Sequence, residues 1–441
     1  MLRKKHLISF FLLTVISQTA IALDFAEALQ RAKTNDPEIQ AAEYSYQAVL
    51  QSRGLSEAAL LPNISLAVYT TQNQQDISNS TIASIPNGSS DSDTQGYTLS
   101  LTQSIYNHSN YKLLQQTDIN IATAKAEIEA ARQALILRVA NVYYNVLAAA
   151  DNVKFAVAEK QAIARQLEQT RKRFEVGLIA ITDVKESQAQ YDIAVAQQIS
   201  ADNKLDISKE ALRSLIGPLD QNVSPLSDNV PLVIPQPNDI RQWTDTAIAN
   251  NLTLQAAQLA FEAAQKQVDI EQSGHYPSLD LSVQHSDDQL DNDAGDRDSE
   301  DTRLSLQLNI PIYSGGYTSA RTRQAVARME QQRALREKAY RQTIQQSRDS
   351  YLGVTTSIAQ VNALKQVLIS TQTAHQATQA GYEAGTRTAV DVLAALREQY
   401  RAERDYAQTR YTYILNILKL KQAAGILSEN DALKINQWLK H

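Results

Sequence analysis

The chain has 441 residues, a formal net charge of −6 and no cysteine. The acidic balance excludes the basic surface that nucleic-acid binding needs, so no nucleic-acid partner is expected. The missing cysteines exclude disulfides and a lipidated cysteine at the start of the mature chain. Only 13 Gly and 10 Pro occur, too few for the loops of several globular domains, and the richness in Ala, Gln, Leu and Arg favours long helices.

The first element in chain order is a predicted secretory signal peptide at residues 1–22. Basic residues 3–5 precede the apolar run Leu7–Ile16, and Ala20-Ile21-Ala22 offers a small-x-small cleavage site. The run is shorter than the ~20 residues that a membrane span needs, so a retained anchor is the weaker interpretation. An exported, cysteine-free, helical chain indicates a bacterial envelope.

The sequence behind the signal contains an internal duplication. Asn35–Val68 aligns without a gap onto Asn250–Val283, and Phe174–Gly177 is echoed by Tyr382–Gly385. Each copy shows the same predicted order: long helix, two short strands, very long helix, turn, helix. Neither copy can bury its own apolar faces, so the duplication predicts an assembly.

Four segments alternate apolar and polar residues with the period of a β-strand: Ile64–Val68, Tyr97–Leu101, Leu279–Val283 and Leu304–Ile310. They predict strands at about residues 62–72, 96–107, 277–286 and 302–313. Polar, acidic loops (70–96 and 285–302) are expected between the paired strands, and tyrosines flank the tracts, as in outer-membrane barrels.

The alternative for these strands is a small soluble sheet with one solvated face. In the membrane interpretation, four strands are too few to close a barrel, and open sheet edges are not tolerated in lipid. A membrane sheet therefore requires several copies of the chain.

The predicted helices are very long. From Asn110 to Phe174 the chain has no Gly or Pro, and apolar residues recur at helical steps. A helix of that length would extend about 95 Å at 1.5 Å per residue. The second copy repeats this run from Ser319 to Tyr382, interrupted only by Gly353 and Gly381, and apolar stripes of this length predict coiled-coil packing. On length alone, a fibrous stalk explains these runs equally well.

These patterns predict a mainly α fold with a small β part and four regions after the signal. They are a first structural repeat at 23–217, a proline-rich linker at 218–238, a second repeat at 239–426 and a C-terminal segment at 427–441. The linker is expected to run outside the helices and to add local structure together with the C-terminal segment.

No catalytic constellation is present in the sequence. The six His are scattered, and no HExxH, GxSxG, Walker or GxGxxG pattern occurs. The acidic stretch 287–301 lacks the glycine and ligand spacing of an EF-hand, so a solvated loop is favoured over a cation site. Neither enzyme activity nor a cofactor or metal is expected.

The order of elements and the duplication resemble the TolC family over essentially the whole mature chain. Two turn motifs carry this resemblance: Phe174-Glu-Val-Gly177-Leu-Ile-Ala-Ile-Thr182-Asp183-Val and Gly381-Tyr382-Glu-Ala-Gly385-Thr-Arg387-Thr-Ala-Val-Asp391-Val. In that family a homotrimer forms a twelve-stranded transmembrane β-barrel, continued by a periplasmic tunnel of antiparallel coiled-coil helices.

The resemblance implies a location in the outer membrane of a Gram-negative bacterium, with a large periplasmic part. It implies an exit duct for multidrug efflux pumps and type I secretion, which passively conducts drugs, small molecules or proteins. The implied partners are two further copies of the chain, outer-membrane lipid, a periplasmic adaptor protein and an inner-membrane transporter of the RND, ABC or MFS type.

The resemblance also implies a gate at the two turns, which the chain places at the periplasmic ends of the long helices. Tyr382 and Arg387 are expected to tie the inner helix pair to its neighbours through Asp183 and Thr182. Only the second copy carries the polar pair, because the matching positions of the first copy are Phe and Ile. Without the family, ordinary surface residues near a turn would be the simpler interpretation.

Asp391 matches the aspartate at the family's narrowest point, where three copies would form an acidic ring that favours cations. The family's second aspartate, three residues on, is Ala394 here, so fewer charges and weaker polycation block are expected. The expected adaptor contacts are the turn tips, which comprise Val176, Gly177, Leu178, Ala384, Gly385 and Thr386. Ala384 stands where the family usually has Val.

A second hypothesis, from another class, is a trimeric envelope stalk or adhesin without a conducting lumen. The sequence favours the duct because the polar faces of the strands, with Ser65, Ser100 and Ser282, suit a wet interior. The conductance of the purified protein separates the two hypotheses.

Overall fold

The computed structural model describes residues 22–79, 81, 87–219, 221–292 and 295–440. The predicted signal peptide at 1–22 lies, apart from its last residue, outside these described residues. The chain divides into two compact units. The hairpin unit comprises the chain up to Gln40, Arg132–Asp245 and Gln346–His441, and the strand unit comprises Ala41–Ala131 and Thr246–Gln345. Each unit contains parts of both sequence repeats.

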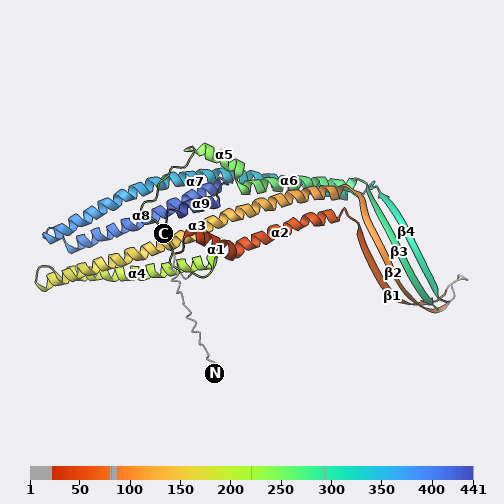
Figure 1. The fold of residues 1–441 in the computed structure, drawn as a ribbon, viewed down its shortest axis with the longest axis horizontal. Helices are drawn as coiled ribbons and strands as arrows, with labels where there is room; N and C mark the ends of the chain where they lie inside the picture. Colours follow the sequence, from red (N-terminus) through yellow and green to blue (C-terminus); the bar gives the residue numbers. More distant parts are fainter. Residues whose placement is uncertain (1–21, 80, 82–86, 220, 293–294, 441) are drawn as a thin grey trace, which may run out of the picture. The chain divides into compact units, whose positions relative to one another are not determined.

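The strand unit contains a single four-stranded antiparallel sheet (Figure 1). Its strands lie side by side in chain order: β1 (Asn63–Ile77), β2 (Gly88–Asn107), β3 (Ser278–Asn292) and β4 (Arg297–Asn309). A register irregularity between Ser104 and Tyr106 interrupts the β2–β3 ladder. The structure thus joins the two predicted strand pairs, one from each repeat, into one sheet.

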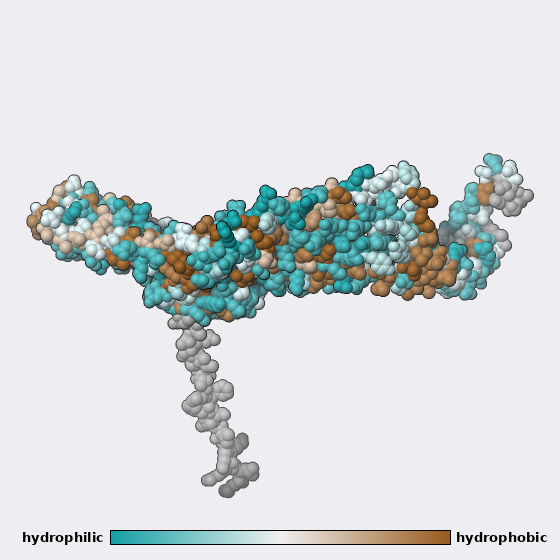
Figure 2. All heavy atoms as spheres, turned by 90° about the horizontal axis from the view of Figure 1, so that it is seen from above, coloured by the Kyte–Doolittle hydropathy of each residue, from teal (hydrophilic) through white to brown (hydrophobic). Residues whose placement is uncertain are grey.

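The strand register places the apolar residues of all four strands on one face. Ile64 pairs with Leu101, Leu101 with Val283, and Val283 with Leu304. Neighbouring positions in the next row are polar, since Ser65 pairs with Ser100 and Ser100 with Gln284. Ile64 and Leu304 are 65% and 72% exposed, and Figure 2 shows apolar surface gathered over the strands. The sheet therefore has one apolar and one polar face.

The strands extend further into the polar stretches than the sequence predicts, whereas the fourth strand ends at Asn309, before the predicted end near residue 313. β1 continues to Ile77, β2 begins at Gly88, and β3 and β4 reach Asn292 and Arg297, so most of the polar stretches expected as loops are strand. The prediction ends where the apolar alternation ends. The ladder continues because backbone groups hydrogen-bond regardless of the side chains they carry, as at the paired Gln72 and Asp93.

The long helices predicted between strand and turn are confirmed. α3 spans His108–Glu175 and α7 spans Tyr317–Glu383 without interruption, and each is followed by a turn and a second helix, α4 (Ile181–Ile216) and α8 (Ala389–Ala423). In the hairpin unit, α3, α4 and α8 share an apolar cluster of Ile163, Ala194, Leu393 and Leu396. The buried Glu159 of α3 accepts a hydrogen bond from Arg404 of α8 at 2.7 Å.

The single long helix expected at the start of each repeat is in fact two helices. These are α1 (Phe25–Asn35) with α2 (Pro37–Ala58), and α5 (Ile240–Asn250) with α6 (Leu252–Gln272). Asp36 is extended (φ −73, ψ 115) because the proline that follows disfavours helical geometry. Asn251 caps α6 by accepting a hydrogen bond from the Leu254 amide at 3.0 Å. Local capping chemistry therefore overrides the continuous helical periodicity.

The proline-rich linker pairs with the C-terminal segment. Leu226 forms an antiparallel bridge with Leu439, and the Lys440 amide donates to the Pro225 carbonyl at 2.8 Å. The C-terminal segment contains the short helix α9 (Glu429–Asn436), and a 3-10 turn, η1 (Ser273–His275), follows α6. None of the helices within the described ranges is both long enough and apolar enough to cross a membrane.

Candidate functional site

A glycine in a left-handed conformation ends each long helix. Gly177 (φ +77) donates its amide to the Phe174 carbonyl at 2.9 Å, and Gly385 (φ +79) donates to the Tyr382 carbonyl at 3.1 Å. A Cβ at either glycine would meet nothing within 4 Å, so the requirement is conformational and not one of space. The sequence motif Val/Ala-Gly thus terminates the helices by satisfying their last carbonyl groups.

The residues expected to meet the adaptor lie open to solvent in the single chain. Val176 and Leu178 are 70% and 72% exposed, and Gly177 is exposed between them. The matching tip of the second repeat, Ala384-Gly385-Thr386, is also exposed. The first tip thus presents two exposed apolar side chains, whereas the second presents Ala384, Gly385 and Thr386.

Tyr382 is the anchor of the second turn. It is 3% exposed and packs against Ala389 and Val392 at the start of α8. The guanidinium of Arg173, from the end of α3, lies 4.2 Å from the centre of the Tyr382 ring and donates to the Tyr382 carbonyl at 3.2 Å. A cation–π contact and a hydrogen bond therefore join the last turn of α3 to the last turn of α7.

Sequence reasoning missed Arg173. The duplication could have drawn attention to this residue. Arg173 stands four residues before Gly177 of the first turn, and the equivalent position before Gly385 of the second turn is Gly381. The Tyr382 hydroxyl is buried without a hydrogen-bond partner among the described residues. A buried hydroxyl without a partner is costly, which is consistent with a partner that a single chain does not contain.

Arg387 lies exposed beside the last turn of α7. A Cβ at Gly381 would lie 2.8 Å from the Arg387 Cγ, so the missing side chain leaves room for the arginine stem. Within the described part of the chain, neither Thr182 nor Asp183 hydrogen-bonds to Tyr382 or Arg387. The four residues expected to form the gate thus lie in the turn regions, but the expected bonds among them are not made between the described residues of one chain.

The two aspartates that follow the turns have different surroundings. Both lie in the first turn of a helix, Asp183 in α4 and Asp391 in α8. Thr388 and Asp391 form a capping box, in which the Thr388 amide donates to the Asp391 carboxylate at 3.0 Å and the Asp391 amide donates to the Thr388 hydroxyl at 3.2 Å. The corresponding cap of α4 is Ala180, which has no side-chain acceptor. The Asp183 carboxylate is therefore not held by a cap.

The capping box lowers the pKa of Asp391. The hydrogen bond from the Thr388 backbone is the largest cause, followed by the bond from its hydroxyl, and the positive charge of Arg387 adds to the effect. These groups favour the charged carboxylate. Asp391 is only partly buried, so its charge can face solvent.

The described residues contain no group of three or more His, Cys, Asp or Glu that could hold a metal ion. The turns instead present exposed apolar tips, a cation–π contact between Arg173 and Tyr382, and two aspartates of which only Asp391 belongs to a capping box.

The sequence matches the family model described as outer membrane efflux protein over residues 28–218 and 243–426. The chain belongs to the outer membrane efflux protein family. The two matched segments cover most of both repeats, and membership places this protein in the outer membrane.

Individual relatives of this outer membrane efflux protein agree. The chain is 35% identical to the outer membrane protein TolC of Vibrio cholerae, over 97% of this chain and 96% of that one. It is 29% identical to the alkaline protease secretion protein AprF of Pseudomonas aeruginosa, over 95% and 88% of the two chains.

A solved structure shares the fold. The Campylobacter jejuni CmeC outer membrane channel superimposes with a TM-score of 0.80 at 15% identity, covering 94% of this chain and 90% of that chain. The three proteins are named as an outer membrane protein, a secretion protein and an outer membrane channel, and none is named as an enzyme.

Proposed function

We propose that three copies of this chain form an outer-membrane exit duct, closed at its periplasmic end by the residues around the two turns. The observation that carries this proposal is the sheet. It has one apolar face, one polar face and only one neighbour each for β1 and β4 among the described residues.

Such a sheet suits a shared barrel. The apolar face would contact lipid, and the polar face would line a wet interior. The free edges of β1 and β4 would pair with neighbouring copies, because unpaired edges cannot remain in a bilayer. Closed symmetry then predicts a ring of identical copies, and the family resemblance supplies the number three.

The duct is passive and serves other machines. A periplasmic adaptor would meet the exposed tips around Gly177 and Gly385, and an inner-membrane transporter of the RND, ABC or MFS type would supply the energy and the cargo. The efflux function in the family's name and the protease secretion in the name of the relative AprF support drugs, small molecules or proteins as cargo. The duct itself performs no catalysis in this proposal.

The gate assignment rests on two features of the turns. The buried Tyr382 hydroxyl lacks a partner in the described residues, and the uncapped Asp183 carboxylate lacks one as well. In the assembly, Tyr382 and Arg387 would bond with Asp183 and Thr182. Each such bond would contribute about 1–3 kcal/mol, repeated in every copy, to the closed state.

Single-channel conductance in planar bilayers tests the duct and its gate. Wild-type protein should show small, cation-selective openings, and the Tyr382→Phe/Arg387→Ser double variant should conduct several-fold more. The single Tyr382→Phe variant is the sharper probe. If the hydroxyl has no partner in the assembly, its removal leaves conductance unchanged and increases stability, and the gate assignment is wrong.

A trimer that never conducts, in wild type or variant, would instead support a stalk or adhesin without a lumen. If the trimer conducts but neither turn substitution changes its conductance, the duct proposal stands and the gate assignment is wrong. The two parts of the proposal therefore fail separately.

A further inference from the structure

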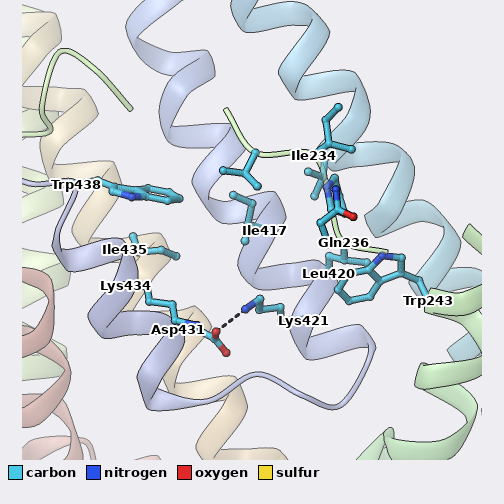
Figure 3. Close-up of a pocket in the computed structure, with 13 residues that line it drawn as sticks. Ile234, Gln236, Trp243, Ile417, Leu420, Lys421, Asp431, Lys434, Ile435 and Trp438 are labelled. Carbon is cyan, nitrogen blue, oxygen red and sulfur yellow. Dashed lines mark hydrogen bonds and ion pairs between the residues drawn. The ribbon is translucent and has the colours of Figure 1, made fainter. Parts of the chain in front are cut away.

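The hairpin unit contains a pocket that the duct does not use. It lies between the linker segment 233–236, helix α8 and helix α9, with a volume of about 300 Å³ (Figure 3). Trp243 of α5 and Trp438, just after α9, stand at opposite sides, and Ile417 and Leu420 of α8 lie between them. These are the only two tryptophans of the chain.

The walls of the pocket are apolar and partly open to solvent. Val233 and Ile234 of the linker are 54% and 48% exposed, although both line the pocket. The linker is nevertheless held in place, because the Val233 amide donates to the Tyr413 hydroxyl at 2.7 Å. A concave, apolar surface on a fixed backbone is the usual form of a small-molecule site.

The acidic group in the pocket wall is already satisfied. Asp431 accepts hydrogen bonds from Lys421, from the Ser428 amide at 3.0 Å and from the Ser428 hydroxyl at 3.0 Å. Burial raises the pKa of Asp431, but the bonds from Lys421 and Ser428 outweigh burial and hold the pKa below its ordinary value. Asp431 and Lys421 thus form a neutral pair within the wall.

Unlike Lys421, Lys434 is not part of an ion pair among the described residues. It lines the pocket from α9 and is exposed, and its ammonium has no hydrogen bond or ion pair with any residue that the structure describes. Lys434 and Trp438 are four residues apart at the end of α9, so they lie on the same side of this segment. An unpaired positive charge therefore borders an apolar pocket with an indole beside it.

We infer that this pocket binds a small amphipathic anion, such as an alkyl or aryl carboxylate. Its apolar part lies against Ile417, Leu420 and the linker side chains, and its carboxylate pairs with the Lys434 ammonium. The free positive charge selects the anion, since a neutral or cationic amphiphile of the same size lacks this pairing. The site lies outside the turn residues, so it does not depend on the proposed gate.

The two tryptophans make the site directly observable. Bromine quenches tryptophan fluorescence on contact, and all of the chain's tryptophan fluorescence arises at this pocket. The full-length protein in lipid nanodiscs is titrated with a medium-chain ω-bromoalkanoate, the ω-bromoalkyl trimethylammonium of equal chain length and the corresponding bromoalkanol. The carboxylate should quench saturably, with a half-quenching concentration roughly tenfold below that of the ammonium.

Two lysine variants assign the charge. Lys434→Gln should bring the carboxylate and the ammonium to nearly equal half-quenching concentrations. Lys419→Gln changes the same charge on α8 at an exposed residue that does not line the pocket, and it should leave the difference intact. Circular dichroism and single-channel conductance should be unchanged in both variants.

Three outcomes would overturn the inference. Equal quenching by all three head groups in the wild type would show an apolar surface without anion selectivity. Linear, non-saturating quenching would show collisions and no site, as expected if a neighbouring copy covers the pocket. Selectivity that survives Lys434→Gln would show that another group binds the anion. Trp243→Phe and Trp438→Phe then report which indole contacts the bromine in a positive result.

Discussion

Arg173 and Gly381 occupy equivalent positions in the two repeats, but Arg173 contributes a long charged side chain and Gly381 contributes none. Gly381 has no side chain, which leaves room for the stem of Arg387 against α7. Arg173 extends a guanidinium over the ring of Tyr382 and bonds to its carbonyl. The equivalent positions of the two repeats thus have different roles: Gly381 leaves space for Arg387, and Arg173 covers Tyr382 of the second repeat.

Removing the Arg173 guanidinium should loosen the second turn. A cation–π contact and a hydrogen bond to a charged donor together contribute about 1–3 kcal/mol at a partly buried site. In Arg173→Gln we expect a conductance above wild type but below that of the Tyr382→Phe/Arg387→Ser variant, measured in planar bilayers.

Lys172→Gln is the matched control for that experiment. Lys172 is the preceding residue, and among the described residues its ammonium forms an ion pair only with Glu168 of its own helix, at 2.7 Å. Its conductance should equal that of the wild type. If Arg173→Gln also conducts like the wild type, the arginine–tyrosine contact has no part in closing the duct.

The lowered pKa of Asp391 predicts how selectivity depends on pH. A carboxylate whose pKa is lowered keeps its charge to a lower pH than an ordinary aspartate. Cation selectivity from an Asp391 ring should therefore persist to a lower pH than an ordinary aspartate would allow. It should be lost as the pH falls through the lowered pKa of Asp391.

Thr388→Val tests this origin of the pKa. The variant removes the hydroxyl bond but keeps the backbone bond, so the pKa of Asp391 should rise only part of the way to its ordinary value. The loss of cation selectivity, measured by reversal potential in a salt gradient, should move to higher pH. An unchanged midpoint would mean that Asp391 does not determine the selectivity.

At the scale of whole elements, α4 and α8 begin differently. Both helices follow a residue with extended backbone, Ala180 (φ −80, ψ 154) and Thr388 (φ −94, ψ 164). Only Thr388 can cap its helix with a side-chain oxygen, and in doing so it engages Asp391. The absence of a cap on α4 costs helix stability, yet it leaves the Asp183 carboxylate able to bind a partner elsewhere.

Ala180→Thr should therefore stabilise α4 and open the duct. The new hydroxyl would complete a capping box with Asp183, at a gain of about 1 kcal/mol, and would withdraw the carboxylate from the gate. We expect a higher melting temperature together with a higher conductance.

Ala180→Gly serves as the control, because glycine is accepted at a helix cap but brings no hydroxyl. It should leave conductance near the wild-type value. A stabilised Ala180→Thr protein that conducts no more than the wild type would exclude Asp183 from the gate.

At the scale of the whole molecule, the two faces of the sheet determine where the protein can reside. Leu281 and Ser282 are adjacent in β3 but lie on opposite faces, since Leu281 pairs with Leu306 and Ser282 with Ser305. An arginine on a lipid face near the middle of a bilayer costs about 2–4 kcal/mol, whereas one on a wet face costs little.

Leu281→Arg should lower the amount of assembled trimer in outer-membrane fractions, and Ser282→Arg should leave it near the wild-type amount. The readout is the trimer recovered from membranes on a native gel. Equal losses in both variants would contradict the assignment of one face to lipid and the other to the lumen.

Much of this architecture can be predicted from the sequence because it depends on local patterns. The Gly- and Pro-free run up to Phe174 specifies α3, the matching run with only Gly353 and Gly381 specifies α7, and the alternation around Leu66, Leu99, Leu281 and Leu306 specifies the four strands. The glycines of the two turn motifs fix where the long helices end. The ends of the strands were not predictable, because the backbone ladder continues after the side-chain pattern stops.

The sequence by itself determined the helices, the strands, the duplication and the turn motifs, because periodicity and glycine conformation act over a few residues. Only the tertiary structure decided which residues meet across long separations. Arg173 lies on Tyr382, and the four apolar strand faces align in one register. The linker and α9 likewise come together to form a pocket that both tryptophans line. Such contacts depend on how whole elements pack, and no local pattern specifies them.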